Sequence, residues 1–161
     1  MRKFEIISEE QWAKDIEEEY MTQCGCENAV KPRRGTKHSA GYDFISPVEI
    51  VIPARKMAKI PTGVKAAMNE DEILSIYPRS SIGFKTGIRL SNTVGVVDSD
   101  YYNNLDNEGH IFIKFFNPTD KDYQIHIGDK IAQGIFTKYL TVDDEEEIET
   151  ERTGGLGSTG K

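Results

Sequence analysis

Residues 111–136 read Ile111-Phe-Ile-Lys-Phe-Phe-Asn-Pro-Thr-Asp-Lys-Asp-Tyr-Gln-Ile-His-Ile-Gly-Asp-Lys-Ile-Ala-Gln-Gly-Ile-Phe136, and this stretch decides the fold class. Short runs rich in β-branched and aromatic residues, at 111–116, 124–127 and 131–136, alternate with Asn, Pro, Asp and Gly. Such runs are typical of strands, and the residues between them are typical of turns. The stretch therefore predicts consecutive β-strands.

The same pattern extends upstream to Gly41. Further short runs lie at 48–52, 57–60, 73–77 and 93–97, spaced by roughly ten residues with no helical segment between them. This arrangement predicts an all-β, antiparallel sandwich or barrel. No repeat of 20–50 residues is visible, which excludes solenoids and propellers.

The two ends of the chain differ from this core. Residues 4–7 predict a first strand, and Ser8 with Gln11 three residues later has the capping-box spacing of a short helix over 9–20. Residues 141–151 carry seven carboxylates and too few apolar residues to fold alone, so we expect an extended strap.

At 161 residues, the chain is expected to form one domain. Its predicted parts are an N-terminal strand, helix and loop (1–39), a β-core (40–140), the acidic strap (141–151) and a glycine-rich C-terminal arm (152–161).

Composition excludes several classes of function. A net charge of −7 argues against sequence-independent binding to nucleic acid, although a few basic groups can still converge on a small anion. No apolar run approaches the ~20 residues that span a membrane, and the N-terminus has no signal-peptide core, so a cytoplasmic location is expected. Cys24 and Cys26 are too close for an easy disulfide and lack partners for a zinc site, which indicates reduced thiols.

The arm, Arg152-Thr-Gly-Gly-Leu-Gly-Ser-Thr-Gly-Lys161, is suited to holding phosphate. Its glycines let backbone N–H groups turn toward an anion, its hydroxyls add donors, and Arg152 supplies a planar cation. We interpret it as a clamp; the alternative is a flexible tail or a tag remnant.

Two polar clusters interrupt the first strands. Ala40-Gly-Tyr-Asp-Phe44 places a carboxylate beside a glycine turn. Tyr77-Pro-Arg-Ser-Ser-Ile-Gly83 places an arginine and two hydroxyls on a loop stiffened by Pro78, as in a phosphate site, although a surface turn would have the same residues. Without a following amphipathic helix this is not a Walker loop, so side chains and loop amides would hold the anion.

The segment Leu90-Ser-Asn-Thr-Val-Gly-Val-Val-Asp-Ser-Asp-Tyr-Tyr102 is more specific. Asn92 can both donate and accept, as reading the imide edge of a pyrimidine requires, and Gly95 lets a flat base approach the backbone. A carboxylate at Asp98 or Asp100 could take a proton from water. The alternative is a hairpin with Asp-Ser-Asp as turn residues. Gly128-Asp-Lys-Ile-Ala-Gln-Gly134 adds a cation and an amide at a strand start, which turn chemistry alone would also explain.

In this order, the clusters resemble the five motifs of the trimeric deoxyuridine triphosphatases (dUTPases). The matches are Ala-Gly-Tyr-Asp at 40–43, Pro-Arg-Ser-Ser-Ile-Gly at 78–83, Asn-Thr-Val-Gly-Val-Val-Asp-Ser-Asp-Tyr at 92–101, Gly-Asp-Lys-Ile-Ala-Gln at 128–133 and Arg-Thr-Gly-Gly-Leu-Gly-Ser-Thr-Gly at 152–160, with Pro-Thr-Gly-Val at 61–64 between them. The resemblance covers Ala40 to Gly160.

The resemblance implies a jelly-roll-like β-subunit that forms a homotrimer with shared active sites, each closed by a C-terminal arm from a neighbouring chain. It implies hydrolysis of dUTP to dUMP and pyrophosphate, which keeps uracil out of DNA and supplies dUMP for dTMP synthesis. Mg²⁺ is the implied cofactor, held by triphosphate oxygens and water. Asp43 would either contact that water shell or serve as a structural carboxylate.

The resemblance also implies residue roles. Asn92 and the backbone around Gly95 and Val97 would recognise uracil, Tyr101 would pack on the deoxyribose and exclude a 2′-hydroxyl, and Asp98 would deprotonate the attacking water. The groups expected to hold the phosphates are Arg79, Ser80, Ser81 and Gly83 near the scissile bond, Gln133 in support, and Arg152, Gly157, Ser158 and Thr159 at the terminal phosphate.

The chain departs from the family pattern at three places. Leu156 stands where the family usually has a phenylalanine over the uracil, so we expect a weaker clamp and a lower KM for Leu156→Phe. Asn103 replaces a usual glycine, and residues 104–110 are longer than a hairpin turn requires, with no role assigned. His110 is expected to be a surface residue, the alternative being a proton relay.

Two other functions compete with dUTP hydrolysis. A dCTP deaminase-like enzyme of the same fold would need an acid/base glutamate at the pyrimidine amine, whereas the carboxylate in the base-reading segment is Asp98. A non-catalytic nucleotide sensor would have lost the water-activating carboxylate or the arm, and the sequence has both.

Overall fold

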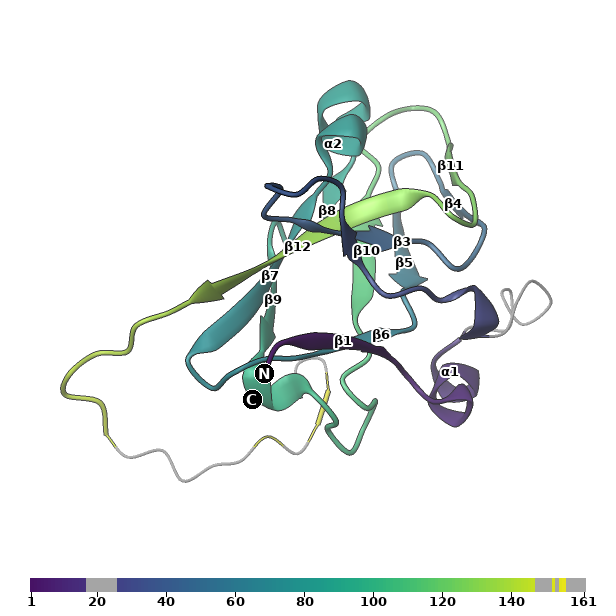
Figure 1. Cartoon of the computed structure of the whole chain (residues 1–161). Helices are drawn as coiled ribbons and strands as arrows, with labels where there is room; N and C mark the ends of the chain where they lie inside the picture. Colours follow the sequence, from purple (N-terminus) through teal and green to yellow (C-terminus); the bar gives the residue numbers. More distant parts are fainter. Residues whose placement is uncertain (17–25, 147–151, 153, 156–161) are drawn as a thin grey trace.

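The structure, a computed structural model, describes residues 1–16, 26–146, 152, 154 and 155. Strands dominate it, and every strand pairing is antiparallel, which confirms the prediction of an all-β, jelly-roll-like fold (Figure 1). The strands are β1 (Lys3–Ile6), β2 (Arg33–Arg34), β3 (Tyr42–Ile45), β4 (Ile50–Ile52), β5 (Met57–Pro61), β6 (Val64–Ala67), β7 (Glu72–Pro78), β8 (Arg89–Leu90), β9 (Gly95–Asp98), β10 (Phe112–Phe116), β11 (Tyr123–Ile125) and β12 (Lys130–Lys138).

A five-stranded sheet in the order β2-β3-β12-β7-β9 forms the frame of the molecule. The long strand β12 pairs with β3 on one side and with β7 on the other, and β7 in turn pairs with β9. Four of the five polar motifs therefore lie on or directly after neighbouring strands of this one sheet.

The smaller sheets, β5-β10-β8, β1-β6 and β11-β4, complete the barrel-like body. Alternation decides which side chains enter the core: in β10, Ile113 and Phe115 are buried while Lys114 is exposed. Phe44 of β3 is also fully buried, so the five-stranded and three-stranded sheets share one apolar cluster.

The N-terminal helix α1 (Glu9–Asp15) begins as predicted, because Ser8 Oγ accepts the Gln11 N–H at 3.1 Å. Its predicted end at Tyr20 is wrong. Ile16 is already extended (φ −83°, ψ 131°) and packs against the core, which ends the helix at Asp15. Residues 17–20 lie outside the described part of the chain.

The prediction of no helix between the strands is also wrong, because α2 (Ser80–Thr86) follows β7 directly. Arg79 is its extended N-cap, and Gly87 ends it in the left-handed region (φ 75°), a conformation that favours glycine. The Pro-Arg-Ser-Ser motif therefore enters a short helix instead of lying on a loop.

After β12 the chain leaves the sheets. Residues 139–146 run outward from the sheets along an exposed path (Figure 1). Tyr139 OH donates to the Glu70 carbonyl at 2.7 Å where this path begins. Residues 147–151 of the strap are not among those the structure describes. In the described residues, no helix has the length and apolar character to cross a membrane.

Candidate active site

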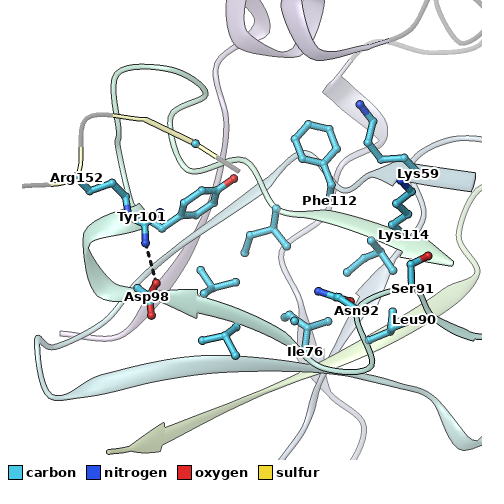
Figure 2. A pocket seen from close by; sticks show the side chains of 16 residues that line it. Lys59, Ile76, Leu90, Ser91, Asn92, Asp98, Tyr101, Phe112, Lys114 and Arg152 are labelled. Atoms are coloured by element: carbon cyan, nitrogen blue, oxygen red, sulfur yellow. Dashed lines mark hydrogen bonds and ion pairs between the residues drawn. The ribbon is translucent and has the colours of Figure 1, made fainter. Parts of the chain in front are cut away.

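A pocket of about 470 Å³ lies between β9, β10 and the start of the C-terminal arm (Figure 2). Its wall is largely apolar, with an amide at one end and carboxylate and guanidinium groups at the other. The lining residues are Lys59, Ile76, Leu90, Ser91, Asn92, Gly95, Val96, Val97, Asp98, Tyr101, Ile111, Phe112, Ile113, Lys114, Arg152 and Gly155.

A tight hairpin places Asn92 and Gly95 together on this wall. Thr93 has a positive φ of 64°, so the strand predicted over 93–97 begins at Gly95 instead. A Cβ at position 95 would lie 3.1 Å from the Ile76 Cβ, closer than most side chains pack, so glycine allows β9 to approach β7 without displacing Ile76. The structure thus brings together the amide and the open backbone that the sequence predicted.

Asp98 ends β9 with its side chain half-exposed at the edge of the pocket. It precedes the 3₁₀ turn η3 (Ser99–Tyr101) but makes no capping hydrogen bond, so the carboxylate is not used by the backbone. Arg152 Nη2 donates to Asp98 Oδ2 at 2.8 Å, and Arg152 Nε donates to Asp100 Oδ1 at 2.7 Å. Arg152, the first residue of the arm, therefore lies at the edge of the pocket of its own chain.

Tyr101 forms a rigid side of the pocket. Its hydroxyl donates to the His110 carbonyl at 2.9 Å and accepts from Asn107 Nδ2 at 2.8 Å. Burial raises the pKa of the phenol, which therefore stays neutral near pH 7. The Arg152 guanidinium lies 5.7 Å from the centre of the ring, so Tyr101 and Arg152 face each other.

His110 is fully buried, and the prediction of a surface position is wrong. Its Nε2 accepts the Gly63 N–H at 2.9 Å, and its Nδ1 lies 2.7 Å from Asp15 Oδ2. Burial lowers the pKa of the imidazole despite the neighbouring Asp15, so the neutral form is favoured, with its proton on Nδ1. Both nitrogens are engaged, which makes His110 a link between α1 and residues 103–110 and not a free proton relay.

Two of the predicted phosphate-binding residues, Arg79 and Ser81, lie elsewhere and line a second pocket of about 420 Å³ together with Lys130. Asp43 is buried there between two cations, with Oδ1 3.2 Å from Arg79 Nε and Oδ2 2.9 Å from Lys130 Nζ. Gln133 Nε2 donates to the Pro78 carbonyl at 3.4 Å. The first, second and fourth motifs therefore converge on one site.

This arrangement favours one of the two roles considered for Asp43. A cation near that carboxylate would be repelled by Arg79 and Lys130, so the geometry favours a structural carboxylate that orients Arg79. Among the described residues, no group of three or more His, Cys, Asp or Glu side chains could hold a metal ion.

The two pockets are separate on one chain. Asp98 pairs with Ile73 at the start of β7, whereas Arg79 follows Pro78 at its end. Six residues of extended strand separate the two positions by roughly 20 Å. A single chain therefore does not bring the Asp98 carboxylate and the Arg79 guanidinium to one phosphate group.

The structure describes some of the remaining predicted site residues and leaves out others. Ser80 and Gly83 lie on α2, and Val97 is a buried residue of β9. Leu156, Gly157, Ser158 and Thr159 of the arm, and also Cys24, lie outside the described residues. Cys26 is a free thiol.

Sequence reasoning missed one contact of the arm: the Gly155 N–H donates to Asp106 Oδ2 at 3.2 Å. The only sequence feature that pointed to this contact was the length of the segment 104–110, which exceeds that of a hairpin turn.

Fold and site together define a class: a jelly-roll-like β-protein with a carboxylate-edged pocket after β9, a cationic cluster after β7, and a glycine-rich arm. The chain belongs to the dUTPase family, whose model matches residues 27–160. It is 48% identical over 130 residues to the deoxyuridine 5′-triphosphate nucleotidohydrolase of Lactococcus lactis, covering 80% of this chain and 87% of the relative. The enzyme of the same name from Arabidopsis thaliana is 40% identical over 138 residues, covering 83% and 78%.

Solved structures of dUTPases are also similar to this chain. The dUTPase of Streptococcus mutans is 40% identical with a TM-score of 0.70, covering 87% of this chain and 98% of that one. A mutant dUTPase from phage phi11 of S. aureus, whose structure reveals the coordination of a structural Mg(II) ion, has a TM-score of 0.68 over 93% of this chain and 99% of that one. At 22% identity it shares the fold alone.

Proposed function

We propose that the protein is a dUTP diphosphatase, which hydrolyses dUTP to dUMP and pyrophosphate. The observation that carries the proposal is the pocket in which Asn92, Gly95 and Tyr101 lie beside the carboxylate of Asp98, in a member of the dUTPase family. Removal of dUTP would keep uracil out of DNA, and the product would supply dTMP synthesis. We place the enzyme in the cytoplasm, where the Cys26 thiol would remain reduced.

The base and sugar sites follow from the pocket wall. The Asn92 amide would donate to and accept from the imide edge of uracil, while the backbone of Gly95 and Val97 would pair with the rest of that edge. The deoxyribose would pack on the Tyr101 ring. Because the Tyr101 hydroxyl is held by the His110 carbonyl and the Asn107 amide, the ring cannot easily move to admit a 2′-hydroxyl.

Asp98 is the proposed general base. Its carboxylate would take a proton from water, and the water oxygen would attack the α-phosphorus in line with the bond to the bridging oxygen. That bond breaks, pyrophosphate leaves with the electron pair, and dUMP retains the new oxygen. Arg152 pairs with Asp98 in the structure, so it would exchange this carboxylate for a phosphate of the substrate, where Gly157, Ser158 and Thr159 would join it.

Magnesium is the proposed cofactor. No three acidic, histidine or cysteine side chains of the described residues form a cation site, so triphosphate oxygens and water would hold the ion. Bound there, it supplies neutralisation of negative charge on the phosphate oxygens. Arg79, Ser80, Ser81 and the backbone at Gly83 would orient the same phosphates, with Gln133 in support.

A homotrimer with shared sites would resolve the separation of the two pockets. The Asp98 pocket of one chain would face the Arg79 cluster of a second chain, so that both act on one nucleotide. The roughly 20 Å between these groups within one chain supports this arrangement.

A nucleotide panel tests the proposal against its alternatives. The protein is incubated with Mg²⁺ and dUTP, dCTP, dTTP or UTP, while pyrophosphate and ammonia are measured separately. Pyrophosphate released from dUTP alone is expected. Ammonia from dCTP would identify a deaminase instead, and nucleotide binding with neither product would identify a sensor.

A further inference from the structure

The N-terminal helix holds the segment 103–110 at two points. We name Ser8 and α1 together, residues 8–15, the brace. At its start, the Ser8 N–H donates to Glu108 Oε2 at 3.1 Å, and the Ser8 hydroxyl donates to Glu108 Oε1. At its end, Asp15 Oδ2 lies 2.7 Å from His110 Nδ1, which carries the proton of the neutral ring.

The brace also forms part of the enclosed site of the His110 ring. Trp12, from the middle of the brace, is buried with its ring centre 6.1 Å from that of His110, and the Phe112 ring lies 4.1 Å away. The Gly63 N–H occupies Nε2, so Asp15, with a side chain only 16% exposed, is the partner of Nδ1. Loss of that carboxylate would leave a buried N–H group unpaired, which destabilises this position of His110.

His110 in turn fixes Tyr101 by two routes. The Tyr101 hydroxyl donates directly to the His110 carbonyl at 2.9 Å. The His110 N–H donates to the Asn107 carbonyl at 2.9 Å, and Asn107 Nδ2 donates to the same Tyr101 hydroxyl at 2.8 Å. Gly109 packs against the backbone here, because a Cβ at this position would lie 2.6 Å from the Tyr101 carbonyl oxygen. A displacement of His110 would therefore move both partners of the hydroxyl.

We propose that the brace is a specificity determinant, which fixes the Tyr101 ring against the deoxyribose by holding Glu108 and His110. The two brace residues that make these contacts are positioning residues, because neither lines the pocket. If the segment 103–110 moved, the ring would follow its partners and leave room for a 2′-hydroxyl. The brace lies outside residues 27–160, which the family model matches. The inference rests on the proposed function, since it requires that the ring packs on the sugar.

Hydrogen exchange tests the contacts without any nucleotide. Asp15→Ala should accelerate amide exchange about tenfold in peptides spanning 102–111, relative to peptides of β12, because the buried imidazole loses a partner and the segment opens more often. The matched control is Lys14→Ala, which removes only an exposed pair with Glu10 on the same helix and should leave exchange unchanged. Equal exchange in Asp15→Ala and the wild type would overturn the brace.

The ratio of kcat/KM for dUTP to kcat/KM for UTP tests the specificity role. A variant that merely unfolds more easily loses both activities equally, so its ratio stays constant. The ratio should fall about tenfold in Asp15→Ala and stay at the wild-type value in Lys14→Ala. Asp15→Asn should largely restore it, because the amide oxygen can still accept the hydrogen bond from His110 Nδ1.

Glu108→Asn tests the other contact and replaces Asp15→Ala if that variant fails to fold. Asparagine tolerates the positive φ of 57° at residue 108 but is too short to reach Ser8, so the ratio should again fall. A ratio unchanged in the folded variants would overturn the specificity role and leave the proposed function intact. A wild-type protein inactive on dUTP would overturn the proposed function, and the ratio of the Kd values for UMP and dUMP would then test the brace in the same variants.

Discussion

At the scale of single residues, Asp98 and Arg152 form an ion pair at the edge of the pocket. The pairing of a candidate base with the arginine of the arm means that two opposite charges compensate each other until a phosphate competes for the arginine. Asp100 shares the same guanidinium but lies one position beyond η3's first residue. Both carboxylates therefore pair with Arg152, but they stand at different positions along the chain, so substitution can separate their roles.

Substitution separates their roles. Asp98→Asn keeps the shape of the side chain but removes the proton acceptor, so kcat should fall by about 10²–10⁴ while nucleotide affinity largely survives. Asp100→Asn, the matched control, also weakens the pair with Arg152 but should change kcat only slightly. Steady-state hydrolysis and binding of a non-hydrolysable dUTP analogue give the two quantities. Activity that survives in Asp98→Asn and disappears in Asp100→Asn would assign the base to Asp100.

His110 makes the stability of the protein depend on pH. The pKa of this buried imidazole lies below its value near 6.5 in the unfolded chain, because burial disfavours the charged form. The unfolded state therefore binds more protons as pH falls below about 6.5, and stability is lost by up to about 1.4 kcal/mol per pH unit down to the folded pKa. Asp15, Glu108 and Lys59 are the charged groups that modulate it.

Urea unfolding between pH 7.5 and 5.5 measures this effect. The wild-type free energy of unfolding should decline more steeply toward acid than that of His110→Gln, which keeps a polar side chain without a titrating group. Parallel declines in the two proteins would mean that other groups carry the pH dependence.

At the scale of elements, the packing of strand β12 against its neighbours leaves no room for a side chain at Gly134. A Cβ at Gly134 would lie 2.9 Å from both Leu74 Cδ1 and Phe44 Cε2, and both of these side chains are fully buried. Gly134→Ala should therefore destabilise the protein by about 1–3 kcal/mol through overpacking. Thermal unfolding measures the loss.

Gly83→Ala is the matched control. Its Cβ would make only ordinary contacts, 3.6 Å from the Ile88 carbonyl oxygen, and it lies inside α2, where alanine is favoured over glycine. Its unfolding temperature should be unchanged or slightly higher. Equal losses for both variants would show that close packing at Gly134 is not the cause.

The elements also show what sequence patterns can predict. Runs rich in β-branched and aromatic residues and bounded by turn residues, such as 111–116, predicted strands correctly because both signals are local. The strand β3 was missed because Asp43 sits within it and is stabilised by Arg79 and Lys130, which are distant in sequence. The helix α2 was missed although Gly87 signals its end, since seven residues show too little periodicity.

In the candidate site, residues close together in sequence were predictable and contacts between distant residues were not. Asn92, Gly95, Asp98 and Tyr101 lie within ten residues of sequence, so their pattern indicated a pocket that the structure forms. The burial of His110 was not predictable, because Asp15 and Gly63 reach it from other parts of the chain. The hydrogen bond from Gly155 to Asp106 was not predictable either, because no local pattern encodes a contact between residues so far apart in sequence.

At the scale of the whole molecule, one chain carries two incomplete halves of the proposed site. The Asp98 pocket and the Arg79 cluster lie at opposite ends of β7, so the proposed mechanism would need two copies of the chain, each contributing one half. A homotrimer satisfies this by rotational symmetry, since every junction is then the same.

Subunit complementation tests this claim most directly. Asp98→Asn and Arg79→Ala should each be nearly inactive on dUTP when assembled alone. Mixed and reassembled in equal amounts, they should regain about a quarter of the wild-type rate, because that fraction of junctions would combine an intact Asp98 from one chain with an intact Arg79 from another. A mixture that stays as inactive as its components, although mixed trimers are shown to form, would contradict the shared site.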